Sequence, residues 1–333
     1  MLRFAILTIV LLGAMVAALT VGRYPLHLAD IREFAEALVG ITTMSPSRYE
    51  LLRNIIVDIR LPRILAAALV GSALASSGAG FQAIFRNPLV SPGILGVLGG
   101  AGFGAAIGIL CSGNWAVVQS CAFAMGLAAV GVSLTVANLF GQASIVMLVL
   151  GGIVSGSLFT AALSIVKYTA DPYDQLPAIV YWLLGNLGTV GLEQIYWAGI
   201  PVITGVIVLS IYGRALDPLT MGDDEARSLG LPAQAIRYAV VAAATLVSAL
   251  SVSLAGMIGW VGLVVPHFAR IVLGPRNVVL VPASALLGAI FLIVADALTR
   301  TLFSTEIPIG IVTELLGIPA FILVLRHTRR GWT

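Results

Sequence analysis

Charged residues are scarce in this sequence: Asp, Glu, Lys and Arg make up 10% of it, and Lys167 is the single lysine. A soluble domain carries roughly 25% charged residues, because its surface must be hydrated. None of the four charged types occurs in the 80 residues from Asn87 to Val166. At about 20 apolar residues per spanning helix, that stretch alone crosses a bilayer three times. The composition therefore excludes a soluble protein and predicts an integral membrane protein.

Motifs for catalysis and for nucleic-acid binding are lacking as well. The sequence has three widely separated histidines, no zinc-protease motif, no nucleophile elbow and no phosphate-binding loop. Its arginines stand at the ends of apolar runs and form no basic cluster, which argues against a nucleic-acid partner. We interpret Cys111 and Cys121 as small buried side chains, with neither a disulfide nor a metal site. We therefore expect no enzyme activity, metal or cofactor in this chain.

Ten apolar runs are long enough to cross a membrane, and we expect them to form one all-α bundle over residues 1–333. They are Phe4–Val21, Pro62–Phe85, Ile94–Cys111, Trp115–Phe140, Ser144–Val166, Ile195–Tyr212, Ala235–Leu254, Met257–Val272, Val278–Ala297 and Ile307–Leu325. An even number of crossings places both termini on one side. Arg3 and the basic tail Arg326–Arg330 favour the cytoplasm, as the positive-inside rule expects.

Two segments between these runs cannot cross the membrane. Residues 22–60 form a polar external loop, in which helices are expected at Asp30, with its capping-box partner Glu33, and at Ser45–Pro46. Gln175–Leu187 is too short to span, so we expect a half-helix whose last residues, Trp182 and Asn186, border a pathway. One packing feature is also visible: glycines recur every four residues in the third run, and such ridges allow close helix contact in lipid. They are Gly96, Gly100, Gly104 and Gly108.

The most informative polar stretch lies at 213–234, on the predicted cytoplasmic side. Asp217–Pro218 is typical of a helix start, and Asp223 would cap a second short helix that ends at Gly230 and Pro232. Two short capped helices would expose apolar residues beside charges, a surface suited to binding a soluble protein. These apolar residues are Leu219, Met221 and Leu229.

Two other classes of function stay open at this point. An ion-coupled secondary transporter uses carboxylates inside the membrane, and the candidates are Asp296, Glu306 and Glu314, each at or near the end of a predicted run. A structural membrane subunit would not depend on the segment at 213–234 for transport.

Five sequence blocks together resemble one family, the FecCD/BtuC-like permeases of ABC importers, which import iron–siderophore complexes, haem and vitamin B12. The blocks occur in the order expected of that family and cover the chain from about residue 60 to the C-terminus. They are Arg60-Leu-Pro-Arg63; Ser77 to Gln82 with Arg86 to Gly96; Leu216 to Pro232; Gly259 to Arg270; and Glu306-Ile-Pro-Ile-Gly310 with Gly317-Ile-Pro319.

The resemblance implies a type II ABC importer permease with ten spans in a bacterial or archaeal plasma membrane. Its partners would be membrane lipid, a second permease copy (a homodimer), two cytoplasmic ATPase subunits that use the ATP, and an external substrate-binding protein. The cargo expected from the family is an iron complex, a siderophore or haem, with vitamin B12 and other corrinoids or molybdate as alternatives.

The resemblance also implies roles for particular residues. Arg60 and Arg300 match the outer arginines that pair with carboxylates of the binding protein. The family's inner gate corresponds here to Gln142–Val146, where Ile145 and Val146 are apolar. The coupling residues that would contact the ATPase are Leu216, Asp217, Pro218, Leu219, Met221, Gly222, Asp224, Glu225, Ala226, Arg227, Leu229 and Gly230.

Overall fold

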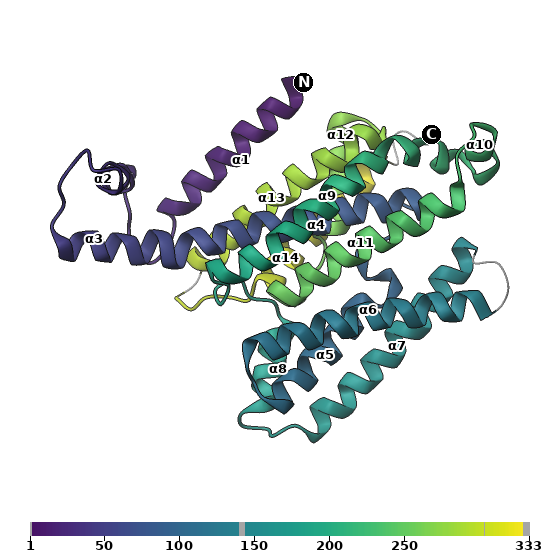
Figure 1. Ribbon diagram of the computed structural model, residues 1–333, viewed down its shortest axis with the longest axis horizontal. Helices are drawn as coiled ribbons and strands as arrows, with labels where there is room; N and C mark the ends of the chain where they lie inside the picture. Colours follow the sequence, from purple (N-terminus) through teal and green to yellow (C-terminus); the bar gives the residue numbers. More distant parts are fainter. Residues whose placement is uncertain (1, 140–143, 303, 329–333) are drawn as a thin grey trace.

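The computed structural model describes residues 2–139, 144–302 and 304–328, and in that part of the chain every regular element is a helix (Figure 1). Seven of these helices are long and apolar enough to cross a membrane, and three shorter apolar helices raise the number to ten. The ten are α1 (Leu2–Thr20), α4 (Leu61–Phe85), α5 (Val97–Cys111), α6 (Trp115–Leu139), α7 (Ile145–Thr169), α9 (Leu192–Met221), α11 (Ala233–Ala255), α12 (Val261–Leu273), α13 (Asn277–Thr301) and α14 (Ile309–Thr328). They stand at the ten predicted runs, so the all-α expectation is confirmed.

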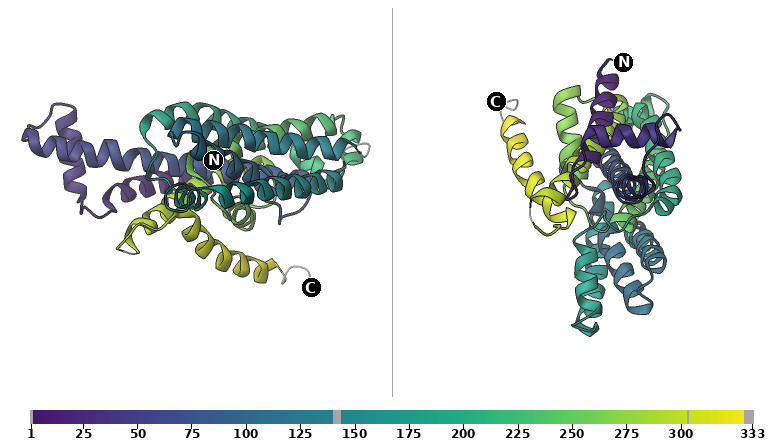
Figure 2. Two further views of the ribbon diagram at one scale, coloured as in Figure 1. Left: turned by 90° about the horizontal axis from the view of Figure 1, so that it is seen from below. Right: turned by 90° about the vertical axis from the view of Figure 1, so that its left-hand side faces the viewer.

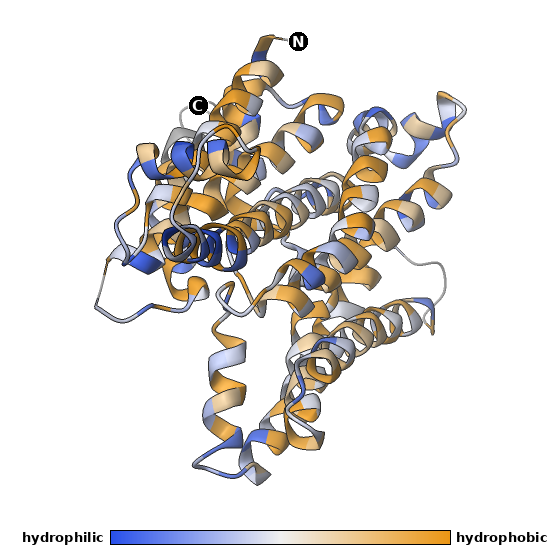
Figure 3. Cartoon of the chain, turned by 60° about the vertical axis from the view of Figure 1, so that its left-hand side comes forward, coloured by the Kyte–Doolittle hydropathy of each residue, from blue (hydrophilic) through white to orange (hydrophobic). Residues whose placement is uncertain are grey.

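The helices form a body around α4, against which α9, α11, α12 and α13 pack, and a second lobe of α5–α8 (Figure 1). We call the two ends of the bundle the α3 end and the α10 end, after α3 (Pro46–Arg53) and α10 (Asp223–Ser228). The last helix, α14, leans away from the body in both views of Figure 2. Hydrophobic residues run along the helices, and hydrophilic ones gather at the ends and loops (Figure 3).

Small residues let α4 lie at the centre. A Cβ atom on Gly71 would come within 2.1 Å of the carbonyl oxygen of Gly288 in α13, and one on Gly78 within 1.9 Å of that of Gly262 in α12. Backbones in membrane bundles approach this closely only where side chains are small. The position of α4 is therefore fixed by backbone contact on two sides.

The predicted glycine ridge of α5 packs against α6. A Cβ on Gly100 or Gly104 would lie 2.3 or 2.1 Å from the carbonyl oxygens of Met125 and Cys121. The prediction of a close helix contact is thus confirmed. The expectation of two buried cysteines is wrong: Cys111 is exposed at the end of α5, Cys121 is half-buried in α6, and both thiols are free.

The segment 22–60 is more helical than expected. It holds α2 (Leu28–Leu38), which begins after His27 and has Asp30 in its first turn, and α3, which begins at Pro46 as predicted. From α3 the chain continues without a break, through a π-helical stretch at Asn54–Arg60, into α4. Pro62 has no backbone N–H to donate to the helical hydrogen-bond ladder, and its ring crowds the preceding turn. This explains why the turn before Pro62 is the wider, π-helical one.

The segment at 213–234 also differs from the prediction. Asp217–Pro218 does not begin a helix, because α9 continues through Pro218 to Met221. The Asp217 carboxylate caps another element instead: it accepts hydrogen bonds from the backbone and side-chain nitrogens of Asn277, at 2.6 and 2.9 Å, at the start of α13. The second short helix is present as α10, but its N-cap is Gly222 and Asp223 is its first residue.

Candidate functional site

The surface at the α10 end is built from the last turn of α9 and from α10. Leu216, Leu219 and Ala226 are buried and hold the two helices on the bundle. Met221 and Leu229 are 75% and 62% exposed. The prediction that Leu219 is exposed is therefore wrong: it is 2% exposed, because α9 keeps its helical phase and turns this side chain inward.

Charged and flexible residues surround the two exposed apolar side chains. The α10 residues of this kind, Asp224, Glu225 and Arg227, are exposed, and Gly230 ends the segment with a left-handed φ of +76°. Asp217, Pro218 and Gly222 are half-buried beside them. An apolar pair with a charged rim is the arrangement found where one protein binds another. Of the residues predicted to contact the ATPase, the exposed ones thus form the surface, and the buried and half-buried ones hold that surface on the bundle.

Asp223 joins α10 to two long helices. Arg237 of α11 donates to both of its carboxylate oxygens, at 2.8 and 2.7 Å. Arg86, which caps α4 with a left-handed φ of +50°, donates to the same carboxylate and, at 2.9 Å, to the carbonyl oxygen of Leu219. Asp223 therefore fastens α10 to α4 and α11 through charge-assisted hydrogen bonds, which are stronger than neutral ones.

The charge of Asp223 is secured by the same two arginines. Partial desolvation raises the pKa of this carboxyl group, but the hydrogen bonds and charges of Arg237 and Arg86 outweigh it. The net pKa of Asp223 lies below its ordinary value. The Asp223 carboxyl group is thus ionised throughout the neutral pH range. The sequence analysis found Asp223 as a helix start and missed its partners, which lie 137 and 14 residues away along the chain.

At the α3 end, Arg60 and Arg300 are close to each other but buried, with 4% and 6% exposure. Arg60 donates to the carbonyl oxygen of Leu19, within the last turn of α1, and to that of Tyr24, beyond its end. Arg300 donates to the carbonyl oxygen of Val21 at 2.8 Å. Cations at a helix C-terminus satisfy carbonyls that have no partner in the helix. In this structure both arginines hold the end of α1.

A neighbouring ion cluster was not predicted from the sequence. Arg63 donates to Asp296 at 2.7 Å, to Glu306 at 2.8 Å and to Thr299 at 3.1 Å. Asp296 is 1% exposed and lies 3.2 Å from Arg300 as well. The cluster ties α4 to α13 and to the segment before α14. Its signal in the sequence is the pair Arg60 and Arg63, three residues apart at the start of one long apolar run.

The four predicted pathway residues fall into two places. Ile145 and Val146 begin α7, where Ile145 packs against the core and Val146 is exposed; Gln142 lies outside the described residues. Trp182 ends the short helix α8 (Gln175–Leu183), and Asn186 follows it. These two share a cavity of about 320 Å³ between α5, α6, α8 and the end of α11. The structure therefore brings together one pair and not all four residues.

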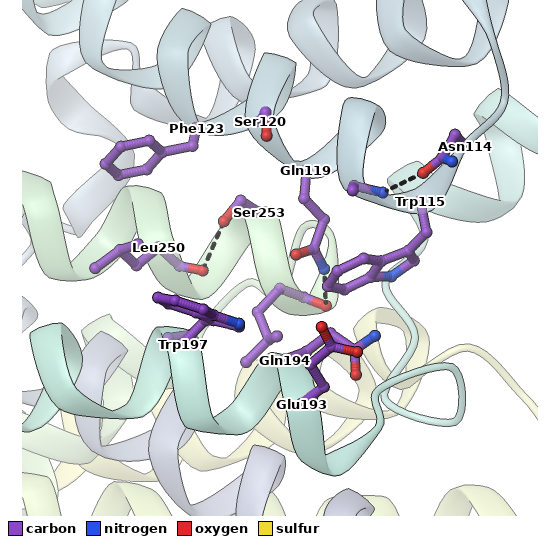
Figure 4. A pocket seen from close by; sticks show the side chains of 13 residues that line it. Asn114, Trp115, Gln119, Ser120, Phe123, Glu193, Gln194, Trp197, Leu250 and Ser253 are labelled. Atoms are coloured by element: carbon purple, nitrogen blue, oxygen red, sulfur yellow. Dashed lines mark hydrogen bonds between the residues drawn. The ribbon is translucent and has the colours of Figure 1, made fainter.

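A second cavity of about 550 Å³ adjoins the first and shares Trp115 and Gln119 with it. Figure 4 shows its polar wall, to which α6 contributes Gln119, α9 Gln194 and α11 Ser253. Gln119 donates to the carbonyl oxygen of Leu254 at 3.4 Å, at the boundary between the cavities. Both cavities lie toward the end of the bundle opposite α10, at the starts of α6 and α9 and the end of α11.

Comparison with known proteins identifies the family. The model of the FecCD transport family matches residues 8–327. The molybdate import system permease protein MolB of Haemophilus influenzae is 34% identical over 98% of this chain and 95% of its own length. A probable iron chelatin transport system permease protein of Helicobacter pylori is 36% identical over 90% of this chain and 91% of its own. The vitamin B12 import system permease protein BtuC of Salmonella paratyphi A is 39% identical over 82% of this chain and 84% of its own.

A solved structure agrees with these relatives. A metal-chelate type ABC transporter in an inward-facing conformation is 33% identical, with a TM-score of 0.85 over 96% of this chain and 97% of its own. The matches remove the ion-coupled carrier and the structural subunit, which the sequence had left open. The chain belongs to the FecCD transport family and is a permease subunit of an ABC importer.

Proposed function

We propose that two copies of this chain form the translocation pathway of an importer for an iron complex, a siderophore or haem. Two ATPase subunits bind the α10 end from the cytoplasm, and an external substrate-binding protein delivers the cargo at the α3 end. ATP binding and hydrolysis in the partners move α10, and alternating access follows at the interface between the permease copies. Both termini then lie in the cytoplasm, and lipid surrounds the outer helices.

The observation that carries this proposal is the construction of α10. A short helix with two exposed apolar residues, Met221 and Leu229, is fastened to α4 and α11 by Asp223. A helix that only covered the bundle would need no such link. The link supports a role in which force from a bound ATPase reaches the spanning helices.

An iron complex is favoured among the cargoes that the names of the relatives mention. The structural neighbour is of metal-chelate type, and the Helicobacter pylori relative is named for iron chelatin. Vitamin B12 or another corrinoid and molybdate are the alternatives, since BtuC and MolB are comparably similar.

Binding-protein docking through Arg60 and Arg300 needs one further step. Their guanidinium groups are occupied by carbonyl oxygens at the end of α1. We infer that carboxylates of the binding protein take over these hydrogen bonds as the end of α1 moves aside. Charged acceptors form stronger hydrogen bonds than neutral carbonyls, which favours the exchange.

Docking is tested with the double variant Arg60→Gln/Arg300→Gln and with Arg53→Gln, an exposed arginine at the same end, as control. We expect capture of the loaded binding protein to weaken at least tenfold in the double variant only. Thermal stability in detergent shows whether the variant is folded. A folded double variant with unchanged capture would contradict the docking role.

The importer itself is tested by reconstitution. The permease is co-purified with its ATPase subunits, placed in liposomes and supplied with the loaded binding protein. We expect ATP hydrolysis to rise when the binding protein carries its cargo, and a panel of ferric siderophores, haem, vitamin B12 and molybdate identifies that cargo. A stable permease that purifies without any ATPase would overturn the proposal.

A further inference from the structure

Glu314 is a carboxylate that neither the α10 surface nor the ion cluster at the α3 end uses. It lies in the second turn of α14, five residues after Ile309, and is exposed. Glu306, just before this helix, pairs with Arg63. Glu314 has no ion pair or side-chain hydrogen bond among the residues that the structure describes.

Lipid is an unfavourable environment for this side chain. The exposed stripe of α14 that begins at Glu314 continues with aliphatic residues, Leu315, Ile318, Ile322 and Leu323. A charged side chain within a spanning helix is strongly disfavoured in hydrocarbon, and such residues face a bundle interior or a water-filled cavity. Glu314 therefore lies on the part of α14 that the assembled importer keeps away from lipid.

The backbone beside Glu314 leads to the same conclusion. A Cβ on Gly259 would lie 3.9 Å from a carboxylate oxygen of Glu314. Gly259 belongs to the break between α11 and α12, and its neighbour Trp260 has a φ of +66°. With 20 residues, α14 is about 30 Å long, the thickness of the hydrocarbon core, so Glu314, five residues after its start, and the break beside it lie inside the core.

Two further helix ends, that of α8 and the start of α14, lie next to the break between α11 and α12. The backbone nitrogen of Asn186 donates to the carbonyl oxygen of Ala255 at 2.8 Å, and that of Gly310 donates to Leu184 at 3.0 Å. The end of α8, the end of α11 and the start of α14 thus converge. Irregular backbone at membrane depth is found only where protein covers it or where it lines a water-filled cavity. An ionisable carboxylate at this convergence fits the second case.

We propose that Glu314 lines the water-filled pathway of the assembled importer and gives it a negative potential that selects against anionic cargo. The inference rests on the proposed function and narrows it: the cargo is a neutral or cationic ferric siderophore, whereas haem, whose two propionates make it anionic, and the dianion molybdate are disfavoured. Across about 7 Å of water, the charge of Glu314 changes the preference between a monovalent cation and a monovalent anion roughly tenfold.

The test measures this potential without knowledge of the cargo. The importer, permease with its ATPase subunits, is reconstituted in liposomes with both native cysteines replaced by serine and with Ile318→Cys, one turn from Glu314 on the exposed stripe. Reaction rates of this thiol are measured with a cationic and an anionic thiosulfonate reagent. We expect reaction with both, a preference for the cation, and an approximately tenfold smaller cation-to-anion ratio after Glu314→Gln.

Glu50→Gln, an exposed carboxylate of α3 outside the cavities, is the matched control and is expected to leave the ratio unchanged. A thiol at Ile318→Cys that does not react, or a ratio that Glu314→Gln leaves unchanged, overturns the inference. Failure of the proposed function is a separate result: the permease without these substitutions then shows no ATP-dependent uptake of any cargo in the panel.

Discussion

Replacing Asp223 by alanine is expected to free α10 from the bundle and to uncouple ATP hydrolysis from transport. The substitution leaves the guanidinium group of Arg237, whose side chain is 8% exposed, without a carboxylate. It also removes the ion pair with Arg86. Both partners of Asp223 belong to spanning helices, so the change acts on the only ionic link described here between α10 and those helices.

The magnitude follows from the burial of the pair. Removing one partner of a fully buried pair costs about 3–5 kcal/mol, and an exposed pair contributes about 0–1 kcal/mol. One third of the Asp223 side chain is exposed while Arg237 is buried, so we expect an intermediate loss of about 2 kcal/mol. That value shifts the equilibrium between attached and detached α10 roughly 30-fold.

Two measurements follow the effect. Hydrogen exchange of the α10 backbone amides should accelerate roughly 30-fold, and the number of cargo molecules moved per ATP hydrolysed should fall in liposomes. Asp224→Ala is the matched control, because this neighbouring side chain is fully exposed and lies 4.0 Å from Arg227, its nearest charged partner. It is expected to change the exchange rates by no more than about twofold.

A double variant separates stability from coupling. In Asp223→Ala/Arg237→Met no unpaired charge stays buried, so most of the lost stability should return, whereas the link stays broken and coupling stays low. The reasoning is refuted if Asp223→Ala retains the exchange rates of Asp224→Ala and the transport stoichiometry of the wild type.

Three further predictions concern stability. Gly71→Val should destabilise the bundle by about 1–3 kcal/mol or more, because no space exists between α4 and α13, whereas Gly131→Val, with nothing within 4 Å, should be nearly neutral in thermal unfolding in detergent. Arg63→Met should cost about 2–3 kcal/mol, because it removes charged hydrogen bonds from Asp296 and Glu306 while Asp296 keeps Arg300, and equal melting temperatures for variant and wild type would contradict it. Because the pKa of Asp223 is lowered on folding, its contribution is complete above the unfolded value of about 3.9 and is lost as pH falls through the folded value. The stability difference between wild type and Asp223→Asn should therefore be constant from pH 5 to 8 and shrink below about pH 4.

The sequence by itself determined the class of the protein and the positions of its spanning helices. The scarcity of charge leaves no soluble fold, and a run of about 20 apolar residues between polar ends is stable only across a membrane. Hydrogen bonds within each helix satisfy its backbone locally, so local sequence is sufficient to find it. The glycine ridge of α5 could be predicted for the same reason, because residues three to four positions apart lie on the same face of a helix.

Tertiary structure decided what the polar residues do. Asp217 and Asp223 look alike in the sequence as helix starts, yet the first caps α13 and the second binds Arg86 and Arg237. Likewise Arg60 and Arg300 are span-end arginines that the end of α1 covers. A charged side chain pairs with whichever partner the packing of distant helices brings within about 3 Å. The residues next to it in the sequence do not predict that partner.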